Sequence, residues 1–408
     1  MKITHRRSTP PVAILALVPV LLLAASCAPE GALEQVPREQ LFTLSYGVLE
    51  DQLDLFRSSS AAAPAKTRLA MRDGIFFVTN GSSGKVLSFS SFGDLLSLVF
   101  DPERNPEPLS LKALDQGEEG SGRVARRYPL AVPGEIAVGS SGMLYVEDRL
   151  PAERRLVDED IGVPLDYVVL RFSREGAFLD FLGQEGLGGT PFPYIDGIYA
   201  VADGGCLVVS MTKDGWLLFR YDANGALLSS VRVRRSALPV PEGERLFANL
   251  EKIVADPRGD GAWLKIDYYR ELVEKDTLAG SGVEYAGSRL YLMDLARAAY
   301  SESIELPPIE TENAGSGAIP PIHELVGIDA SGRIYLSATG LDGSFTVSVM
   351  DRDSRRPKRY ALPIELDELE YATFNLSPEG ILSALLATRF EARVVWWRFD
   401  KAFAPAVK

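Results

Sequence analysis

The chain has 408 residues, 46% of them hydrophobic, and a formal net charge of −13 at pH 7. This length and apolar content supply a large core, either as two ordinary domains or as one repeat assembly. We expect no nucleic-acid partner, because neutralising phosphates requires a basic surface. An acidic body is also repelled by anionic lipid headgroups, so any membrane contact should come from an anchor.

Residues 1–26 have the features of a secretory signal. Lys2, Arg6 and Arg7 form a cationic start, and the apolar run Val12–Ala25 is too short for a confident transmembrane span. The ending Ala24-Ala25-Ser26-Cys27 resembles a bacterial lipobox, with Ala24 where Leu is usual. That resemblance implies cleavage before Cys27 and attachment of diacylglycerol to its sulfur. An ordinary signal peptide with an incidental cysteine is the alternative.

A lipidated Cys27 would anchor the chain to the bacterial membrane, on its periplasmic or surface side. Each buried lipid methylene contributes about 0.8 kcal/mol to membrane affinity. Residue 28 is Ala rather than the Asp of an inner-membrane retention signal, which favours the outer membrane. We expect residues 27–39 to form a polar tether and residues 40–408 to form one domain.

Beyond Cys27, the body of the chain has one cysteine and one histidine, Cys206 and His323. This excludes an internal disulfide framework, and we expect no zinc site. Cys206 opens an apolar strand, where a small buried side chain is expected rather than a nucleophile. His323 follows two prolines, and we expect a surface residue in a loop.

The stretch Ile198–Val233 shows how the rest of the chain is organised. Four apolar runs alternate with the short turns Ala202–Gly205, Thr212–Gly215 and Asp222–Gly225. This pattern predicts four antiparallel strands joined by tight hairpins. So small a sheet needs similar sheets on both sides to bury its two faces.

Six segments share a signature, in which an aromatic residue or Met is followed by Ser or Asp at the end of an apolar run. The pairs are Phe89-Ser90, Phe172-Ser173, Tyr221-Asp222, Met293-Asp294, Met350-Asp351 and Phe399-Asp400. Radial stacking of four-stranded sheets is the usual solution for such repetition. The sequence therefore predicts an all-β fold, a β-propeller of six four-stranded blades. Few residues follow the last pair, so we expect Gln40–Gly47 to complete the sixth sheet and close the ring.

Long connections should all project from one rim of this ring. In an up-and-down sheet the second connection and the crossing to the next sheet lie on the same rim. All long segments belong to this group: Asp101–Leu130, Glu147–Leu165, Gly183–Tyr194, Arg234–Leu246, Tyr268–Tyr285 and Pro307–Glu324. We call this rim the loop-bearing face, and we expect binding residues there.

The candidate binding residues on this face are Glu147, Asp148, Gln184, Glu185, Asp267, Tyr268 and Tyr269. The three carboxylates at strand ends could ligate a hard cation such as Ca²⁺, and capping of a loop is the alternative. The tyrosines offer stacking surface for a sugar or a peptide. Gln184 and Glu185 lie in a glycine-rich loop that lacks the helix and Lys-Ser/Thr of a phosphate-binding loop. We assign no catalytic residue and expect no cofactor, with a divalent cation left open.

The repeat units resemble NHL-type six-bladed propellers, most clearly over Ile136–Gly183 and Ile195–Val231. The whole mature chain is similar to a family of spirochaetal lipoproteins, a resemblance that implies no activity. It is carried by Gly93-Asp94-Leu95-Leu96, Asn105-Pro106, Gly183–Pro193, Ser377-Pro378-Glu379-Gly380 and Trp396-Trp397-Arg398.

The sequence thus predicts a lipid-anchored protein of the cell envelope. Its loop-bearing face would bind an envelope protein or a glycan without catalysis. The alternative is a metal-dependent hydrolase, similar to lactonase-like propellers, with carboxylates at the channel mouth. The metal ligands of that family do not map onto residues of this chain.

Overall fold

The structure is a computed structural model, and it describes most of the chain beyond the leader. The described residues are 33–56, 65–120, 122–159, 162–243, 245–273, 280–309, 321–340, 342–352 and 357–403. The predicted signal peptide and Cys27 lie outside these residues. Within the described residues, no helix combines the length and the apolar character that crossing a membrane requires.

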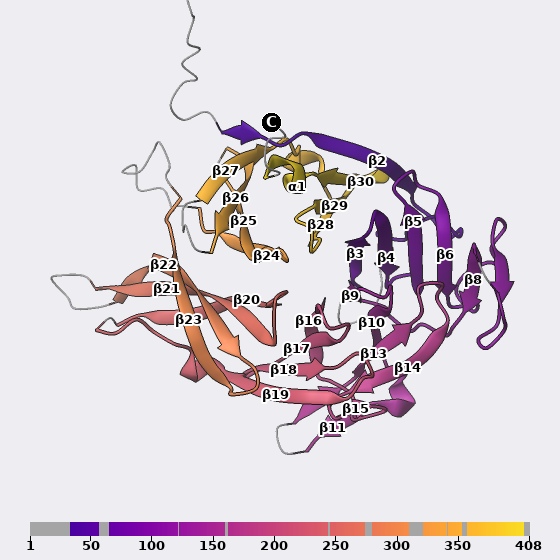
Figure 1. The fold of residues 1–408 in the computed structure, drawn as a ribbon, viewed down its shortest axis with the longest axis horizontal. Helices are drawn as coiled ribbons and strands as arrows, with labels where there is room; N and C mark the ends of the chain where they lie inside the picture. Colours follow the sequence, from indigo (N-terminus) through magenta and orange to yellow (C-terminus); the bar gives the residue numbers. More distant parts are fainter. Residues whose placement is uncertain are drawn as a thin grey trace, which may run out of the picture. The chain divides into compact units, whose positions relative to one another are not determined.

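The described strands form six sheets of four to six strands and one two-stranded sheet (Figure 1). In the first three large sheets the strands, from the innermost outward, are as follows. The first has β3 (Thr67–Arg72), β4 (Ile75–Asn80), β5 (Lys85–Ser90), β6 (Leu95–Phe100), β8 (Val124–Arg127) and β7 (Lys112–Leu114). The second has β9 (Ile136–Val138), β10 (Leu144–Arg149), β13 (Tyr167–Phe172), β14 (Phe178–Gly183) and β15 (Gly186–Leu187). The third has β16 (Tyr194–Ala200), β17 (Cys206–Thr212), β18 (Gly215–Tyr221) and β19 (Leu227–Arg234).

The remaining sheets follow the same order. The fourth has β20 (Phe247–Ala255), β21 (Gly261–Val273), β22 (Gly280–Asp294) and β23 (Ala299–Leu306). The fifth has β24 (Glu324–Ile328), β25 (Arg333–Thr339), β26 (Phe345–Asp351), β27 (Pro357–Leu362) and β1 (Glu34–Gln35). The sixth has β28 (Tyr371–Leu376), β29 (Leu382–Ala387), β30 (Glu391–Trp397) and β2 (Arg38–Ser45). The two-stranded sheet pairs β11 (Leu156–Asp158) with β12 (Val163–Leu165). The described helices are short: α1 (Phe399–Ala402) and three 3₁₀ turns, Ala152–Arg154, Arg235–Ala237 and Leu366–Glu368.

The sheets are arranged around a common centre within the unit Glu34–Lys408. The innermost strands contact each other in the cyclic order β3, β9, β16, β20, β24 and β28, with β28 next to β3 again (Figure 1). This arrangement is a β-propeller, so the predicted all-β class and architecture are confirmed. Its core lies between successive sheets, where large side chains such as Trp263 and Trp397 are 1% and 0% exposed.

The signature pairs explain why the hairpins form where they do. Tyr221 is fully buried between sheets, while the carboxylate of Asp222 accepts hydrogen bonds from the backbone N–H groups of Asn224 and Ala226 at 2.9 and 2.8 Å. Gly225 then adopts a φ of +86°, which a glycine reaches without steric cost. The pairs that end at Ser90, Ser173, Asp222 and Asp294 therefore join a core anchor to a turn cap.

The predicted closure is also present. β2 pairs antiparallel with β30 and becomes the outermost strand of the sheet that β28 begins. It begins at Arg38, slightly before the predicted Gln40, and β1 pairs in parallel with β27. Four residues of the predicted tether are thus in strands, Glu34 and Gln35 in β1 and Arg38 and Glu39 in β2. Pairing satisfies the N–H and C=O groups of otherwise open sheet edges.

The detail of six four-stranded blades is wrong, because only the sheets of β16, β20 and β28 have four strands. The others gain β1, β15 or the pair β7 and β8 at their outer edge, where an uncovered strand would leave backbone groups unpaired. The predicted loop Asp101–Leu130 thus contains two strands parallel to β6 and follows the outer edge of its sheet. The predicted loop Tyr268–Tyr285 is mostly the extended hairpin of β21 and β22.

The prediction for His323 is wrong, and that for Cys206 is confirmed. His323 is only 5% exposed and lies near Lys265 and Asp267 of β21. Its burial, helped by Lys265, lowers the pKa of the imidazole to about 4. Cys206 is fully buried and unpaired, and burial raises the pKa of its thiol to about 12.

Candidate functional site

The six large sheets together line one cavity, the central channel. Residues from β3, β9, β16, β20, β24 and β28 line a cavity of about 390 Å³. This volume lies in the range of small-molecule pockets, about 300–1,000 Å³. Each innermost strand enters the channel from the loop-bearing face, so its first residues lie near that mouth.

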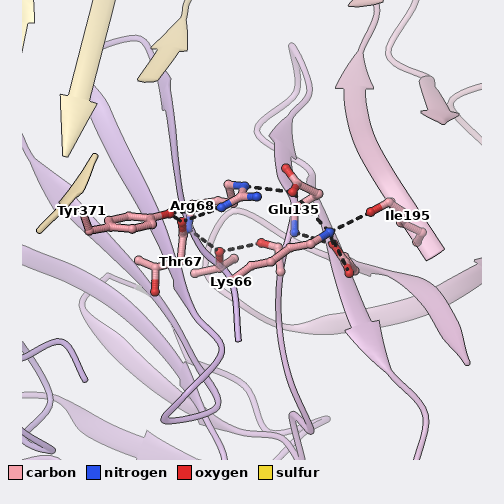
Figure 2. Close-up of polar contacts among 9 residues, drawn as sticks. Lys66, Thr67, Arg68, Glu135, Ile195 and Tyr371 are labelled. Atoms are coloured by element: carbon pink, nitrogen blue, oxygen red, sulfur yellow. Dashed lines mark hydrogen bonds and ion pairs between the residues drawn. The ribbon is translucent and has the colours of Figure 1, made fainter. Parts of the chain in front are cut away.

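A cluster of charged side chains closes one side of this mouth (Figure 2). The ammonium group of Lys66 lies 2.8 Å from Glu147 Oε2 and 3.3 Å from Glu135 Oε1, and it donates a hydrogen bond to the carbonyl oxygen of Ile195 at 2.7 Å. Arg68 Nε donates to Glu135 Oε1 at 2.8 Å. The cluster thus joins residues next to β3, β9 and β16 with Glu147 on β10.

The same cluster reaches the sixth sheet through Tyr371 on β28. Arg68 Nη1 lies 3.1 Å from the Tyr371 hydroxyl, and that hydroxyl donates to the carbonyl oxygen of Thr67 (Figure 2). These contacts cross the junction between the sheet that β2 completes and the sheet of β3. The cluster therefore holds neighbouring sheets together at the point where the ring closes.

Two cations and two carboxylates balance each other in this cluster. Burial lowers the pKa of Lys66, but Glu147 and Glu135 raise it by more, so Lys66 remains charged. Burial raises the pKa of Glu147 above its ordinary value, against the opposite effect of Lys66. A charge-balanced, hydrogen-bonded group of this kind is chiefly structural.

The seven predicted binding residues lie in three separate regions, on β10, between β14 and β15, and on β21, and do not converge. Glu147 belongs to the channel cluster, while Asp148 accepts hydrogen bonds from the backbone of Ala131 and Val132 at 3.1 and 2.7 Å. Burial raises the pKa of Asp148 to about 7, against those bonds. Gln184 Nε2 donates to the carbonyl oxygen of Pro191, and Glu185 accepts from the backbone of Thr190.

The other three predicted residues are on β21. Asp267 does not end its strand; it lies within β21 and accepts hydrogen bonds from Lys265 Nζ at 2.7 Å and from Ser288 Oγ. Tyr268 is 2% exposed, and its hydroxyl lies 2.9 Å from that of Tyr291. Tyr269 is half-buried and packs edge-on against Tyr285, with ring centroids 6.1 Å apart.

The structure offers no added support for a metal site. In the part of the chain that the structure describes, no three His, Cys, Asp or Glu residues are grouped to hold a metal ion. The oxygens of Glu147, Asp148 and Asp267 already accept hydrogen bonds from protein donors. The hydrolase alternative and the divalent cation therefore stay predictions.

Two further groups of charged residues were not anticipated from the sequence. One is the pair Asp196 and Lys252, which lines the channel on β16 and β20. The other comprises four exposed cations on the loop-bearing face at the third sheet, which we call the basic patch: Lys213, Arg232, Arg234 and Arg235.

The sequence held a signal for both groups. Arg68, Glu135, Asp196 and Lys252 stand in or beside the first strands of four successive repeats, so aligning the repeats on their turn glycines would have placed them at one channel. The basic patch follows from the alternation Val231-Arg232-Val233-Arg234, which places both valines in the core and both arginines in solvent.

Comparison with known proteins leaves the assignment at the level of the fold. No protein-family model matches the chain, and no curated protein is similar to it in sequence. The chain is similar to a streptogramin B lyase structure, with 13% identity and a TM-score of 0.37 over 88% of this chain and 97% of that chain. An ulvan lyase of polysaccharide lyase family PL25 gives 12% identity and a TM-score of 0.39 over 88% of this chain and 83% of that chain. A nidogen/laminin complex gives 14% identity and a TM-score of 0.35 over 79% of this chain and 93% of that chain. These TM-scores are below 0.5, so the propeller assignment rests on the sheet topology of this chain, and the NHL-type and spirochaetal resemblances stay predictions.

Proposed function

We propose that this protein is a lipid-anchored, non-catalytic binding protein of the bacterial cell envelope. An acylated Cys27 would hold it at the membrane, on the periplasmic or surface side and with the outer membrane favoured. The six large sheets would act as propeller blades that present the loop-bearing face to an envelope protein or a glycan. The single observation that carries the proposal is the basic patch on that face.

The basic patch is unusual in a chain with a net charge of −13. Lys213, Arg232, Arg234 and Arg235 are all exposed, and none of them forms an ion pair with a carboxylate among the described residues. They line a hollow of about 570 Å³ next to the turn between β17 and β18, together with a single acidic residue, Asp214. Four like charges that repel one another in an acidic protein favour an anionic partner at this point.

Local structure fixes the position of these side chains. Gly215 has a φ of +152°, and a Cβ added there would lie 2.0 Å from the carbonyl oxygen of Val233. Only glycine therefore lets the end of β19 approach the β17–β18 turn. Arg235 packs its guanidinium over the Trp216 ring, 4.5 Å from its centroid, and its backbone N–H donates to the carbonyl oxygen of Asp214.

The hollow continues toward the second sheet. A second hollow of about 470 Å³ shares Lys213 and Arg235 and is also lined by Tyr167 and Tyr194. Aromatic rings beside cationic side chains suit a glycan with acidic groups or an acidic loop of a protein. This surface supports binding from the loop-bearing face.

The test is a cross-linking pull-down from envelope extract with the full, acylated protein. We expect a partner to be recovered by the wild type, to be lost with Arg232→Gln/Arg234→Gln/Arg235→Gln, and to be released as salt rises. Arg389→Gln/Arg297→Gln removes exposed arginines elsewhere and should leave recovery unchanged. Recovery of nothing after cross-linking, or equal recovery by the patch variant, would count against the proposal.

The anchor is tested separately. Mass spectrometry of the mature protein should find a diacylglyceryl group on Cys27, and Cys27→Ala should move the protein from the membrane to the soluble fraction. A mature protein without acyl chains would refute the proposed address while leaving the binding face untouched.

A further inference from the structure

The channel contains two opposite charges that the protein itself leaves unmatched. Asp196 lies on an innermost strand yet is exposed, and it lines the cavity, so its carboxylate faces the channel. It has no hydrogen bond or ion pair from its side chain to any described residue. Lys252 also lines the cavity and donates one long hydrogen bond, 3.3 Å, to the carbonyl oxygen of Val326. It forms no ion pair with any residue that the structure describes.

These residues are aimed into the channel by irregularities of the strands. The register of β16 against β17 shifts between Ile195 and Gly197, so Asp196 is an extra residue without a partner opposite it. The register of β20 against β21 also shifts between Leu250 and Lys252; the extra residue there is Glu251, and Lys252, opposite Lys265, follows it directly. A β-bulge of this kind turns a side chain out of the regular alternation, and bulges are frequent next to binding sites.

Nearby groups do not neutralise the pair. Glu135 is already bound by Lys66 and Arg68, and Glu251 accepts from the backbone of Leu325. Loss of hydration inside the channel, together with Glu135, raises the pKa of Asp196, and burial lowers the pKa of Lys252. The two groups attract each other and nearby charges, but this attraction does not offset the loss of hydration. A bound molecule could supply the missing compensation.

A hydroxyl group adds direction to the site. Tyr199 lines the cavity on β16, two residues beyond Gly197, and its hydroxyl has no hydrogen-bond partner among the described residues. A Cβ at Gly197 would lie 2.8 Å from this hydroxyl. The absence of a side chain at Gly197 therefore leaves room for the Tyr199 hydroxyl beside the residue that follows Asp196. The phenol can donate to a carboxylate or accept from an ammonium group.

We propose that the channel binds a small zwitterion, with the ammonium group of the ligand at Asp196 and its carboxylate at Lys252. Free amino acids and short peptides are the chemical class that fits a cavity of about 390 Å³. A simple anion would leave Asp196 unpaired, and a simple cation would leave Lys252 unpaired. The inference is independent of the proposed docking on the loop-bearing face, since it concerns different residues and a different ligand.

The test compares zwitterionic and singly charged probes on the full protein by isothermal titration calorimetry and thermal unfolding. The zwitterions are glycine, L-alanine and glycylglycine, and the singly charged probes are acetate and methylammonium at equal ionic strength. At least one zwitterion should bind and raise the Tm, and both singly charged probes should bind about tenfold or more weakly. This arm needs no variant. The proposal is overturned if no zwitterion binds at millimolar concentration, or if acetate or methylammonium binds equally well.

Variants test the assigned residues. Asp196→Asn and Lys252→Met should each weaken zwitterion binding about tenfold, while Asp196→Glu should restore part of the affinity. The controls Asp51→Asn and Lys112→Met change exposed charges outside the channel and should bind as the wild type does. Neither channel variant removes an ion pair, so both should keep the wild-type Tm without ligand. Unchanged binding in both folded variants would overturn the assignment.

Discussion

Replacing Lys66 by methionine is the most direct test of the idea that the channel cluster holds the ring together. The side chain of Lys66 is 12% exposed, and that of its partner Glu147 is 2% exposed. Lys66→Met keeps most of the side-chain volume and leaves a buried carboxylate without its cation. Removing one partner of a buried ion pair costs about 3–5 kcal/mol.

This cost can be converted into a change in thermal stability. An unfolding entropy of about 2.1 cal/mol/K per residue gives about 0.8 kcal/mol/K for a domain of this size, so the Tm should fall by about 4–6 °C. Differential scanning calorimetry at pH 7 measures it. Lys112→Met, at an exposed site, is the matched control and should change the Tm by less than about 1 °C.

The pH dependence gives a second readout with a defined sign. In Lys66→Met the pKa of Glu147 should lie further above its unfolded value, because burial is no longer opposed by the cation. The folded state then binds a proton more readily than the unfolded state, so stability should recover as pH falls from 7 toward 5. Lys66→Met/Glu147→Gln should likewise recover most of the loss. A Tm of Lys66→Met equal to that of the wild type would refute the reasoning, as would a double variant no more stable than the single one.

Three further outcomes follow from buried groups. Cys206 should react with thiol reagents at pH 8 only when the protein unfolds, because the thiol is fully buried and its pKa is raised to about 12; rapid labelling of the native protein would contradict this. The pKa of His323 is about 4 in the folded protein and has its ordinary value in the unfolded chain, so about 3 kcal/mol of the free energy of unfolding should be lost as pH falls from 6.5 to 4. Urea unfolding of the wild type and of His323→Gln across this pH range measures the loss. Parallel pH profiles for the two proteins would contradict the prediction. Gly215→Ala should cost about 1–3 kcal/mol, since its Cβ would meet the Val233 carbonyl oxygen, and a wild-type urea midpoint would disprove that close approach.

The propeller could be predicted because its repeat is encoded locally. The pair Tyr221-Asp222 joins a buried ring to a turn cap three residues before a left-handed glycine, and these three roles need only neighbouring residues. The closing strand β2 was also predictable, because an alternating segment precedes a last sheet that lacks its fourth strand. The turn chemistry of neighbouring residues and the number of strands in each repeat were therefore enough to predict the propeller architecture.

The additions at the sheet edges could not be predicted in this way. β1 is only two residues long and pairs in parallel with β27, which is more than three hundred residues away in sequence. The parallel pairing of β8 with β6 likewise depends on how residues 101–123 return along the sheet. Such short strands carry no periodicity of their own, so tertiary contact determines them. His323 was misplaced for the same reason, since its burial comes from a distant sheet.

The channel residues show what a register shift hides from the sequence. In a regular strand alternate residues face opposite sides of the sheet, and on that rule Asp196 belongs with Tyr194 and Ile198. Aligning the repeats would place Asp196 at the channel, but the bulge that breaks the alternation there is visible only once the partner strand β17 is known. The same propeller satisfies one group of buried charges, around Lys66, with paired carboxylates and backbone carbonyls. It leaves Asp196 and Lys252 without such partners in the same cavity. The contrast between these two groups of charges in one cavity favours the channel as a binding site, because a ligand can compensate the pair that the protein leaves without ion pairs.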